Sequence, residues 1–143
     1  MMVSTKGRYA LRVMIDLAEH DDGLYIPLKE IAARQDISEK YLESIVKLLT
    51  RNGDLVGVRG KGGGYRLTRP AANYRISDIL LLTEGSLAPV ACLEPGAAGC
   101  ARLSECRTYQ LWRGLDEVIR TYLDQITLAD LARPAQSGDH YMI

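Results

Sequence analysis

The residues best suited to chemistry in this chain are its three cysteines, Cys92, Cys100 and Cys106, which fall in one short segment. Seven residues separate the first two and five separate the last two. Thiolates on a flexible segment that contains glycine can converge on a soft metal or an iron–sulfur cluster, and zinc or a 2Fe–2S cluster takes a fourth ligand. Buried structural thiols are the alternative, because the close Cys-x-x-Cys pair of most zinc sites is missing. The confinement of all three to one segment without apolar periodicity favours ligation.

A thiol-based enzyme is another function class that cysteines suggest, and the sequence argues against it. Catalytic thiolates are activated by a nearby histidine or by a second thiol in a Cys-x-x-Cys motif. The two histidines, His20 and His140, both lie far from the cysteines in sequence. We therefore predict that the chain is not an enzyme.

Length and composition predict one good core, since the chain has 143 residues of which 47% are hydrophobic. The formal net charge is zero, but residues 1–75 carry 13 Lys+Arg against 9 Asp+Glu (+4), and residues 76–143 carry 5 against 9 (−4). Neutrality therefore does not exclude nucleic acid, because binding responds to the local field of one face.

The amino end lacks a signal-peptide pattern and no run reaches membrane-spanning length, so we expect a cytoplasmic protein. In that compartment an odd number of cysteines argues against disulfides.

The stretch from Ile37 to Thr68 predicts the elements around which the chain is organised. Ser38 is a suitable N-cap and Asn52-Gly53 a suitable stop, which together predict a helix of about four turns. Apolar residues recur on one face at helical spacing, and the other face is polar. The apolar face comprises Leu42, Ile45, Val46 and Leu49, and the polar face comprises Glu39, Lys40, Glu43, Ser44, Lys47 and Arg51.

A glycine-tipped basic ribbon follows this helix. Residues 55–59 and 65–68 have strand composition, and residues 60–64 can form a turn with positive φ angles. A helix followed by such a ribbon is a winged helix-turn-helix layout, in which the helix fits the DNA major groove and the ribbon reaches phosphates or the minor groove. The alternative is a solvated basic loop on an ordinary α+β domain. The basic residues of the ribbon and its connector are Arg59, Lys61, Arg66, Arg69 and Arg75.

Two further helices are predicted before residue 37. The first runs from about Lys6 to Glu19, because its apolar residues recur at helical spacing. Tyr25-Ile26 is a candidate short strand, and Pro27 is well placed to open the second helix. A short link then joins that helix to the one capped by Ser38, which makes a helix-turn-helix pair.

The carboxyl half is predicted to contain a helix from residue 76 to about 85, capped by Ser77, and a long loop over residues 86–106. A long helix follows from Thr108, and its broad apolar stripe predicts a dimerisation helix or, alternatively, a helix packed only on its own core. Thr127 and Asp130 have the spacing of a capping box that opens a last short helix. The apolar residues of the long helix are Leu111, Trp112, Leu115, Val118, Ile119, Tyr122, Leu123 and Ile126.

Several motifs cover nearly the whole chain up to about Ala132. They are STKGRYAL (Ser4 to Leu11), PLKEIAARQDISEKYLE (Pro27 to Glu43), VRGKGGGYRL (Val58 to Leu67), the three loop cysteines, LW (Leu111-Trp112) and ITLADL (Ile126 to Leu131). Together they resemble the Rrf2 family of bacterial winged-helix regulators, and within it the iron–sulfur cluster regulators of the Isc type. The combination is far more specific than any single motif.

The resemblance implies a homodimer that binds a double-stranded DNA operator, with the helix between Ser38 and Asn52 in the major groove and the wing at the minor groove. It also implies that the three cysteines hold a 2Fe–2S cluster whose presence alters which promoters are bound. We expect a mainly α fold with a small β-wing: a DNA-binding domain over residues 1–75, a cysteine loop and dimerisation helix over 76–132, and a tail over 133–143. The expected DNA-binding residues are Lys6, Arg8, Tyr9, Ser38, Lys40, Tyr41, Glu43, Ser44, Lys47, Arg51, Arg59 and Lys61.

Two positions, Ser44 and Tyr109, depart from the family pattern, and Glu43 matches it. Ser44 stands where a glutamine often follows YLE, and serine is too short for a bidentate contact to adenine, which implies a different operator. Glu43 matches a recognition-helix acid that would favour the amino group of cytosine. Tyr109 stands where Isc-type members have a histidine as fourth cluster ligand, so Glu94, Glu105, a partner-chain group or an external thiol would have to substitute.

The last residues, 140–143, resemble the aromatic tail of some Gram-positive family members, among them a repressor of cysteine metabolism that lacks the cysteines. This resemblance gives the alternative function: a repressor of cysteine or sulfur metabolism controlled by a partner protein or a small molecule, without an obligatory cluster.

Overall fold

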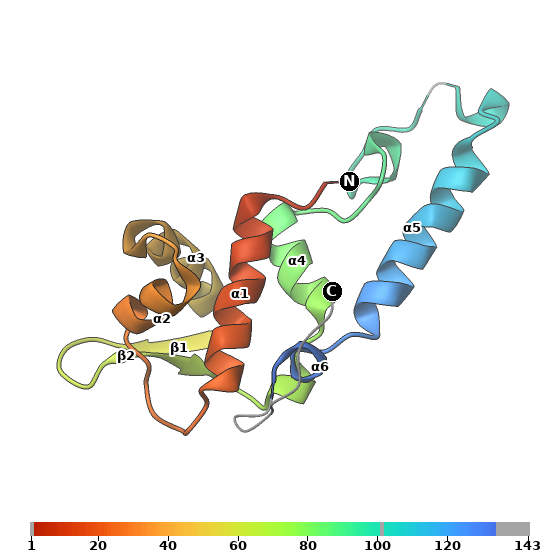
Figure 1. Cartoon of the computed structure of the whole chain (residues 1–143). Coiled ribbons are helices and arrows are strands. Elements are labelled where there is room, and N and C mark those ends of the chain that lie inside the picture. Colours follow the sequence, from red (N-terminus) through yellow and green to blue (C-terminus); the bar gives the residue numbers. More distant parts are fainter. Residues whose placement is uncertain (1, 101, 134–143) are drawn as a thin grey trace.

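The structure, a computed structural model, describes residues 2–100 and 102–133. A body of helices and a two-stranded sheet forms one end of the molecule, and one long helix stands apart from it (Figure 1). No helix in the described ranges is long and apolar enough to cross a membrane. The helices are α1 (Thr5–Glu19), α2 (Leu28–Gln35), α3 (Glu39–Arg51), α4 (Ile76–Glu84), α5 (Tyr109–Asp124) and α6 (Leu128–Leu131), the strands are β1 (Leu55–Val58) and β2 (Gly64–Leu67), and 3₁₀ turns occupy Ala71–Asn73, Ala91–Leu93 and Leu103–Glu105.

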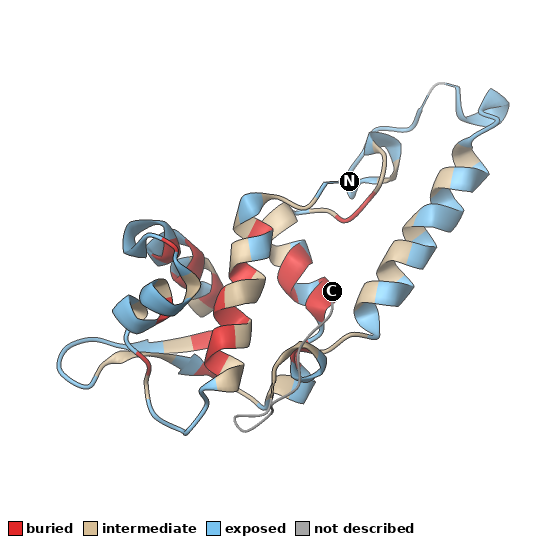
Figure 2. Ribbon diagram, viewed as in Figure 1, coloured by how far each residue is buried: buried red, intermediate tan, exposed pale blue. Residues whose placement is uncertain are grey.

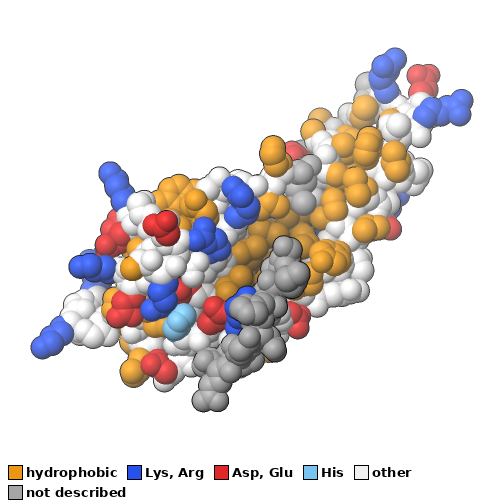
Figure 3. Space-filling model, viewed as in Figure 1, with side chains coloured by type: hydrophobic (Ala, Val, Ile, Leu, Met, Phe, Trp, Pro, Cys, Tyr) orange, Lys and Arg blue, Asp and Glu red, His pale blue; other side chains and the backbone are white. Residues whose placement is uncertain are grey.

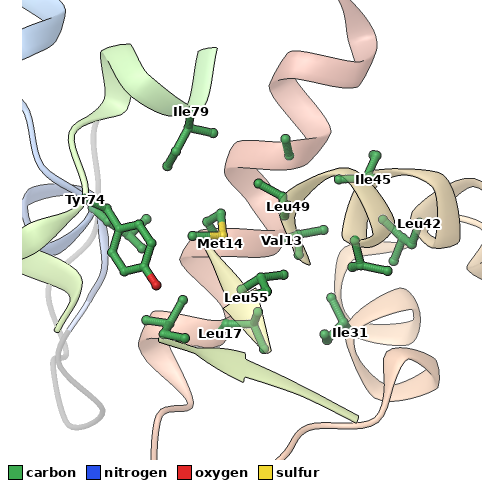
Figure 4. Packing of buried hydrophobic residues seen from close by; sticks show 14 of the residues in the cluster. Val13, Met14, Leu17, Ile31, Leu42, Ile45, Leu49, Leu55, Tyr74 and Ile79 are labelled. Atoms are coloured by element: carbon green, nitrogen blue, oxygen red, sulfur yellow. The ribbon is translucent and has the colours of Figure 1, made fainter. Parts of the chain in front are cut away.

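Helix α1 forms the centre of the core, with α2, α3, α4, α6 and β2 packed around it (Figures 1 and 4). The apolar stripe predicted from the sequence is buried, since Val13, Met14 and Leu17 are at most 1% exposed. The helix begins at Thr5, one residue before the predicted start, because the hydroxyl of Ser4 accepts a hydrogen bond from the Gly7 N–H at 3.0 Å.

Helices α2 and α3 form the predicted helix-turn-helix pair. The chain turns between them at Asp36, which adopts a left-handed conformation with φ of 53°. Ser38 caps α3 as predicted, and the helix ends at Arg51 before Gly53, whose φ is 82°. The four residues assigned to the apolar face of α3 are all fully buried, which confirms that assignment.

The two strands pair antiparallel, from Leu55 opposite Leu67 to Val58 opposite Gly64. The predicted strand at Tyr25-Ile26 is reduced to a single bridge, in which Ile26 and Tyr65 exchange backbone hydrogen bonds of 2.9 and 2.8 Å. Gly64 permits this approach, because a Cβ at that position would lie 2.2 Å from the carbonyl oxygen of Ile26. The wing is therefore attached to the α1–α2 connection as well as to α3.

The predicted cap of α4 is wrong, because the helix begins at Ile76 and Ser77 lies inside its first turn. The Ile76 N–H donates instead to the carbonyl of Ile126 at 2.9 Å, and the Leu128 N–H donates to the carbonyl of Tyr74 at 2.9 Å. A returning segment of backbone thus does what a side-chain cap would do. Gly85, with φ of 77°, ends the helix where the sequence predicts.

Helix α5 follows the long loop and stands off the body, with no fully buried residue along its length (Figure 2). Ile119 and Leu123 pack partly against the core, and Ile126, predicted as part of this helix, lies just beyond its end. The predicted capping box is confirmed: Thr127 and Asp130 exchange side-chain to backbone hydrogen bonds of 2.8 and 3.2 Å, which opens α6.

Replacing Gly64 by alanine should destabilise the protein more than replacing Gly62. Both residues have positive φ, 146° and 77°, which strains an L-residue by about 1–2 kcal/mol. At position 64 the new Cβ would also collide with the carbonyl of Ile26, whereas nothing lies within 4 Å of one at position 62. In urea titrations the free energy of unfolding should fall by about 1 kcal/mol for Gly62→Ala and by at least about twice that for Gly64→Ala. Equal losses would contradict the close approach.

Candidate nucleic-acid interface

The polar face of α3 is open to solvent. Two hydroxyls on this face make local hydrogen bonds, since Ser38 Oγ accepts from the Tyr41 N–H at 3.1 Å and Ser44 Oγ donates to the Tyr41 carbonyl at 2.8 Å. The Ser44 oxygen can still accept a hydrogen bond from a ligand. The exposed residues of this face include Ser38, Lys40, Tyr41, Glu43, Ser44, Lys47 and Arg51, all of them predicted to contact DNA.

The amino-terminal end of α1 lies beside this face. The rings of Tyr9 and Tyr41 meet edge to face, with centroids 5.5 Å apart and an interplanar angle of 80°. Arg8 is exposed and Lys6 partly exposed on the same end of α1. The structure thus brings Tyr9 of the first motif against the predicted recognition helix, with Lys6 and Arg8 on the same end of α1.

A buried carboxylate fixes α2 against α1. Asp16 is fully buried, and Arg34 donates to its two oxygens at 2.8 and 3.0 Å while Gln35 Nε2 donates at 2.9 Å. These hydrogen bonds from the guanidinium to Asp16 raise the pKa of Arg34. A buried charge is tolerated only when it is paired and hydrogen-bonded, so this group specifies one docking of α2.

Gln35 extends this network toward Tyr9 and Tyr41. Arg12 Nε donates to Gln35 Oε1 at 3.1 Å, a second Arg12 nitrogen contacts the Gln35 carbonyl, and the Arg12 guanidinium lies 5.2 Å from the centre of the Tyr9 ring. The sequence predictions missed this network. Its one detectable signal was Asp16, an acid placed within the apolar stripe of α1.

The structure divides the basic residues of the wing into two groups. Arg66 donates to the Gly23 carbonyl at 3.1 Å and stacks on Tyr25, while Arg69 pairs with Asp54 at 3.1 Å and stacks on Tyr74, so both of these serve the fold. Arg59 and Lys61 are exposed, Arg59 directly after β1 and Lys61 in the turn at the tip of the wing. Lys and Arg side chains project around the end of the molecule that carries α2, α3 and the hairpin (Figure 3).

A groove separates the carboxyl-terminal half of α3 from the wing, and we call it the helix–wing groove. Lysine and arginine side chains contribute to it from both sides, and its described lining contains no acidic residue. Its electrostatic character therefore suits an anion. The lining residues are Lys47, Thr50, Arg51, Gly57, Val58, Arg59 and Tyr65.

The three cysteines are free and exposed on the loop between α4 and α5. The structure does not bring them together: in residues 2–100 and 102–133 no three His, Cys, Asp or Glu side chains are placed to hold a metal ion, and this includes Glu94 and Glu105. The donor set itself is suitable, because exposed thiols can ionise and thiolates are the usual ligands of iron–sulfur clusters. Three-cysteine ligation therefore requires the loop to fold closer on itself.

Cys106 has the most distinctive environment of the three. Its sulfur lies 3.5 Å from Thr108 Oγ1, and this hydrogen bond, with the Thr108 N–H next in strength, lowers the pKa of the thiol. The sequence departure at Tyr109 falls at the first residue of α5. The site is thus an exposed thiol with a lowered pKa, three residues before the long helix.

The exposed helix and the wing beside it define the class, a winged helix-turn-helix protein. Residues 3–134 match the family model Rrf2, described as an iron-dependent transcriptional regulator. The chain belongs to the Rrf2 family. It is a DNA-binding transcriptional regulator and not an enzyme, as the sequence predicts.

Its similarity to individual proteins extends over most of the chain. The HTH-type transcriptional regulator IscR of Yersinia pseudotuberculosis serotype O:1b (strain IP 31758) is 39% identical over 131 residues, which is 92% of this chain and 79% of that protein. Among solved structures, CymR, the global cysteine regulator of B. subtilis, has a TM-score of 0.76 at 35% identity and covers 92% of this chain and 96% of its own. IscR of T. potens has a TM-score of 0.72 at 34% identity, with coverage of 99% and 95%.

Replacing Thr108 by valine should raise the pKa of the Cys106 thiol, because it removes the hydroxyl that stabilises the thiolate. In a Cys92→Ser, Cys100→Ser background, the pH profile of alkylation by iodoacetamide should shift to higher pH, and the rate below the inflection should fall. Thr121→Val, on the exposed side of α5, is the control and should leave the profile in place. An unshifted profile for Thr108→Val would show that the hydroxyl does not act on the thiol.

Proposed function

We propose that this chain is a cytoplasmic, homodimeric regulator that binds an operator through α3 and the wing and senses iron–sulfur status through a 2Fe–2S cluster. The observation that carries the proposal is the position of its three exposed thiols, on the loop that connects the DNA-binding body to the protruding helix. The similarity to regulators named IscR supports the same assignment. The cluster, the dimer and the DNA-contact residues are all parts of the proposal.

The proposed recognition surface has three parts. The exposed face of α3, with Lys40, Glu43 and Ser44, enters the major groove, where side chains can reach base edges. The end of α1 that carries Lys6, Arg8 and Tyr9 lies beside it and contacts phosphates. Arg59 and Lys61 are on the wing, which reaches the minor groove, where arginine is attracted most strongly when the groove is narrow.

The proposed sensor is the set of thiolates on Cys92, Cys100 and Cys106. When bound, the cluster supplies a redox-active inorganic group that cross-links these three positions of the loop. The fourth ligand comes from outside this set. Because Cys106 lies three residues before α5, ordering of the loop changes the entry of that helix, and couplings of this kind are worth about 1–3 kcal/mol.

The proposed dimer contact is the outward stripe of α5. Four apolar side chains recur on one face of the helix at intervals of four, three and four residues. Exposed apolar residues in such a continuous row mark an interaction surface. A symmetric dimer also places two recognition helices on two half-sites. The exposed fractions are 60% for Leu111, 39% for Leu115, 65% for Val118 and 63% for Tyr122.

A second candidate function is repression of cysteine or sulfur metabolism under the control of a partner protein or small molecule. The similarity in structure to CymR, the global cysteine regulator of B. subtilis, favours it. The tail resemblance that first suggested it, at residues 140–143, lies outside the described residues. On this alternative, operator binding is independent of cluster loading.

Anaerobic reconstitution with iron and sulfide should give the wild-type protein visible charge-transfer absorption, and Cys92→Ala should lose most of it. Ser104→Ala, in the same loop, is the control and should keep the absorption. Duplexes selected from a random library by the loaded and the cluster-free protein should then differ in sequence. Colourless wild-type protein, or a coloured Cys92→Ala variant, would contradict the sensor, and identical selected sequences would favour the second candidate.

Introducing a charge into the outward stripe of α5 should separate the dimer. Val118→Glu is expected to run as a monomer in light scattering and to bind a two-half-site duplex at least about tenfold more weakly, because a desolvated carboxylate at the interface is unpaired. Gln110→Glu adds the same charge to an exposed position off the stripe and should remain dimeric. A dimeric Val118→Glu variant would move the interface elsewhere.

A further inference from the structure

The helix–wing groove contains residues to which neither the sequence patterns nor the family resemblance gives a role. Its cations come from two elements, with Lys47 and Arg51 on α3 and Arg59 directly after β1 on the wing. Thr50 and Tyr65 belong to the same lining. The groove is therefore lined by cations from two elements, with a threonine and a tyrosine in the same lining.

The geometry of duplex DNA says what this groove faces, given the proposed function on which this inference rests. The major and minor grooves are separated by a sugar-phosphate strand. If α3 occupies one groove and the wing the next, that strand must cross the space between them. The helix–wing groove is this space on the protein side.

We propose that the helix–wing groove seats one phosphodiester of the crossing strand, and that Thr50 and Tyr65 are DNA-contact residues in addition to the cations. The two positive walls attract the phosphate from opposite sides. The contact fixes the angle between the helix in one groove and the wing in the other. Phosphate contacts of this kind set the register in which the bases are read.

The hydroxyl of Thr50 provides independent support. It is shut off from solvent and has no hydrogen-bond partner in the described structure. An unsatisfied buried hydroxyl costs free energy, and such a group calls for a specific explanation. A phosphate oxygen in the groove supplies the missing partner after a rotation of the threonine side chain.

The floor of the groove is shaped by a glycine. Gly57 pairs with Tyr65 across the hairpin, and a Cβ at position 57 would lie 2.8 Å from the tyrosine ring. Gly57 therefore leaves room for the ring beside β1. The backbone of Gly57 carries no positive φ, so room for the ring is the reason for glycine here.

Single neutral methylphosphonate linkages placed along a duplex selected by the protein will test the seat. For the wild type, one linkage between the α3-bound and wing-bound grooves should weaken binding about tenfold, as expected for one charge-assisted hydrogen-bonding site. Arg51→Gln should bind the unmodified duplex more weakly, lose this sensitivity and reduce the slope of log K against log salt by about 0.9. Lys29→Ala, an exposed cation on α2, should keep both properties.

Thr50→Val separates the contact from a structural effect. The isosteric change removes an unsatisfied hydroxyl, so the free protein should be as stable as the wild type or more stable in urea, while duplex affinity falls about tenfold. If the wild type binds the duplex but no single neutral linkage has an effect that Thr50→Val or Arg51→Gln removes, the groove proposal is overturned and the proposed function stands. If no duplex is selected at all, both are overturned.

Discussion

The pairing of Asp16 with Arg34 and Gln35 is the interaction that gives this structure its geometry. Apolar burial around α1 supplies most of the stability, but it is non-directional and would tolerate several dockings of α2. A buried carboxylate is less tolerant, because every oxygen left without a donor costs free energy. With α2 fixed to α1, the turn at Asp36 fixes α3, and the Arg12–Tyr9–Tyr41 contacts support it from the other side.

The wing depends on a second constraint of the same directional kind. Gly64 lets two backbones approach closely enough to exchange hydrogen bonds with Ile26, and Arg66 and Arg69 hold the ribbon from its edges. Arg66 and Arg69 are engaged in these contacts, whereas Arg59 and Lys61 are exposed on the described surface. The basic ribbon thus contains arginines that stabilise the fold and cations that stay exposed, and this division follows from which arginines have an aromatic ring or carboxylate within reach.

Patterns that depend on neighbours in sequence were predictable. The apolar face of α3, its Ser38 cap, the glycine turn and the Thr127 capping box all involve residues within a few positions of one another, and all are confirmed. Features that depend on distant segments were not. Ser77 looked like a cap because the sequence cannot show that Ile126 returns to the same helix end, and Asp16 gave no hint of which cation it would meet. The three cysteines were recognised as a group by proximity along the chain, yet their spacing could not predict that the described structure does not bring them together.

The backbone hydrogen bonds that join Ile76 to Ile126 and Tyr74 to Leu128 bring the two ends of a long excursion to one place. The excursion leaves the body through α4, includes the cysteine loop and α5, and closes at α6. Its entrance and exit are adjacent, so the part of it beyond α4 can lengthen, shorten or be replaced with little effect on the geometry of the helix-turn-helix and the wing. In such an arrangement the signal that a regulator senses can change during evolution while the DNA sequence that it binds stays the same.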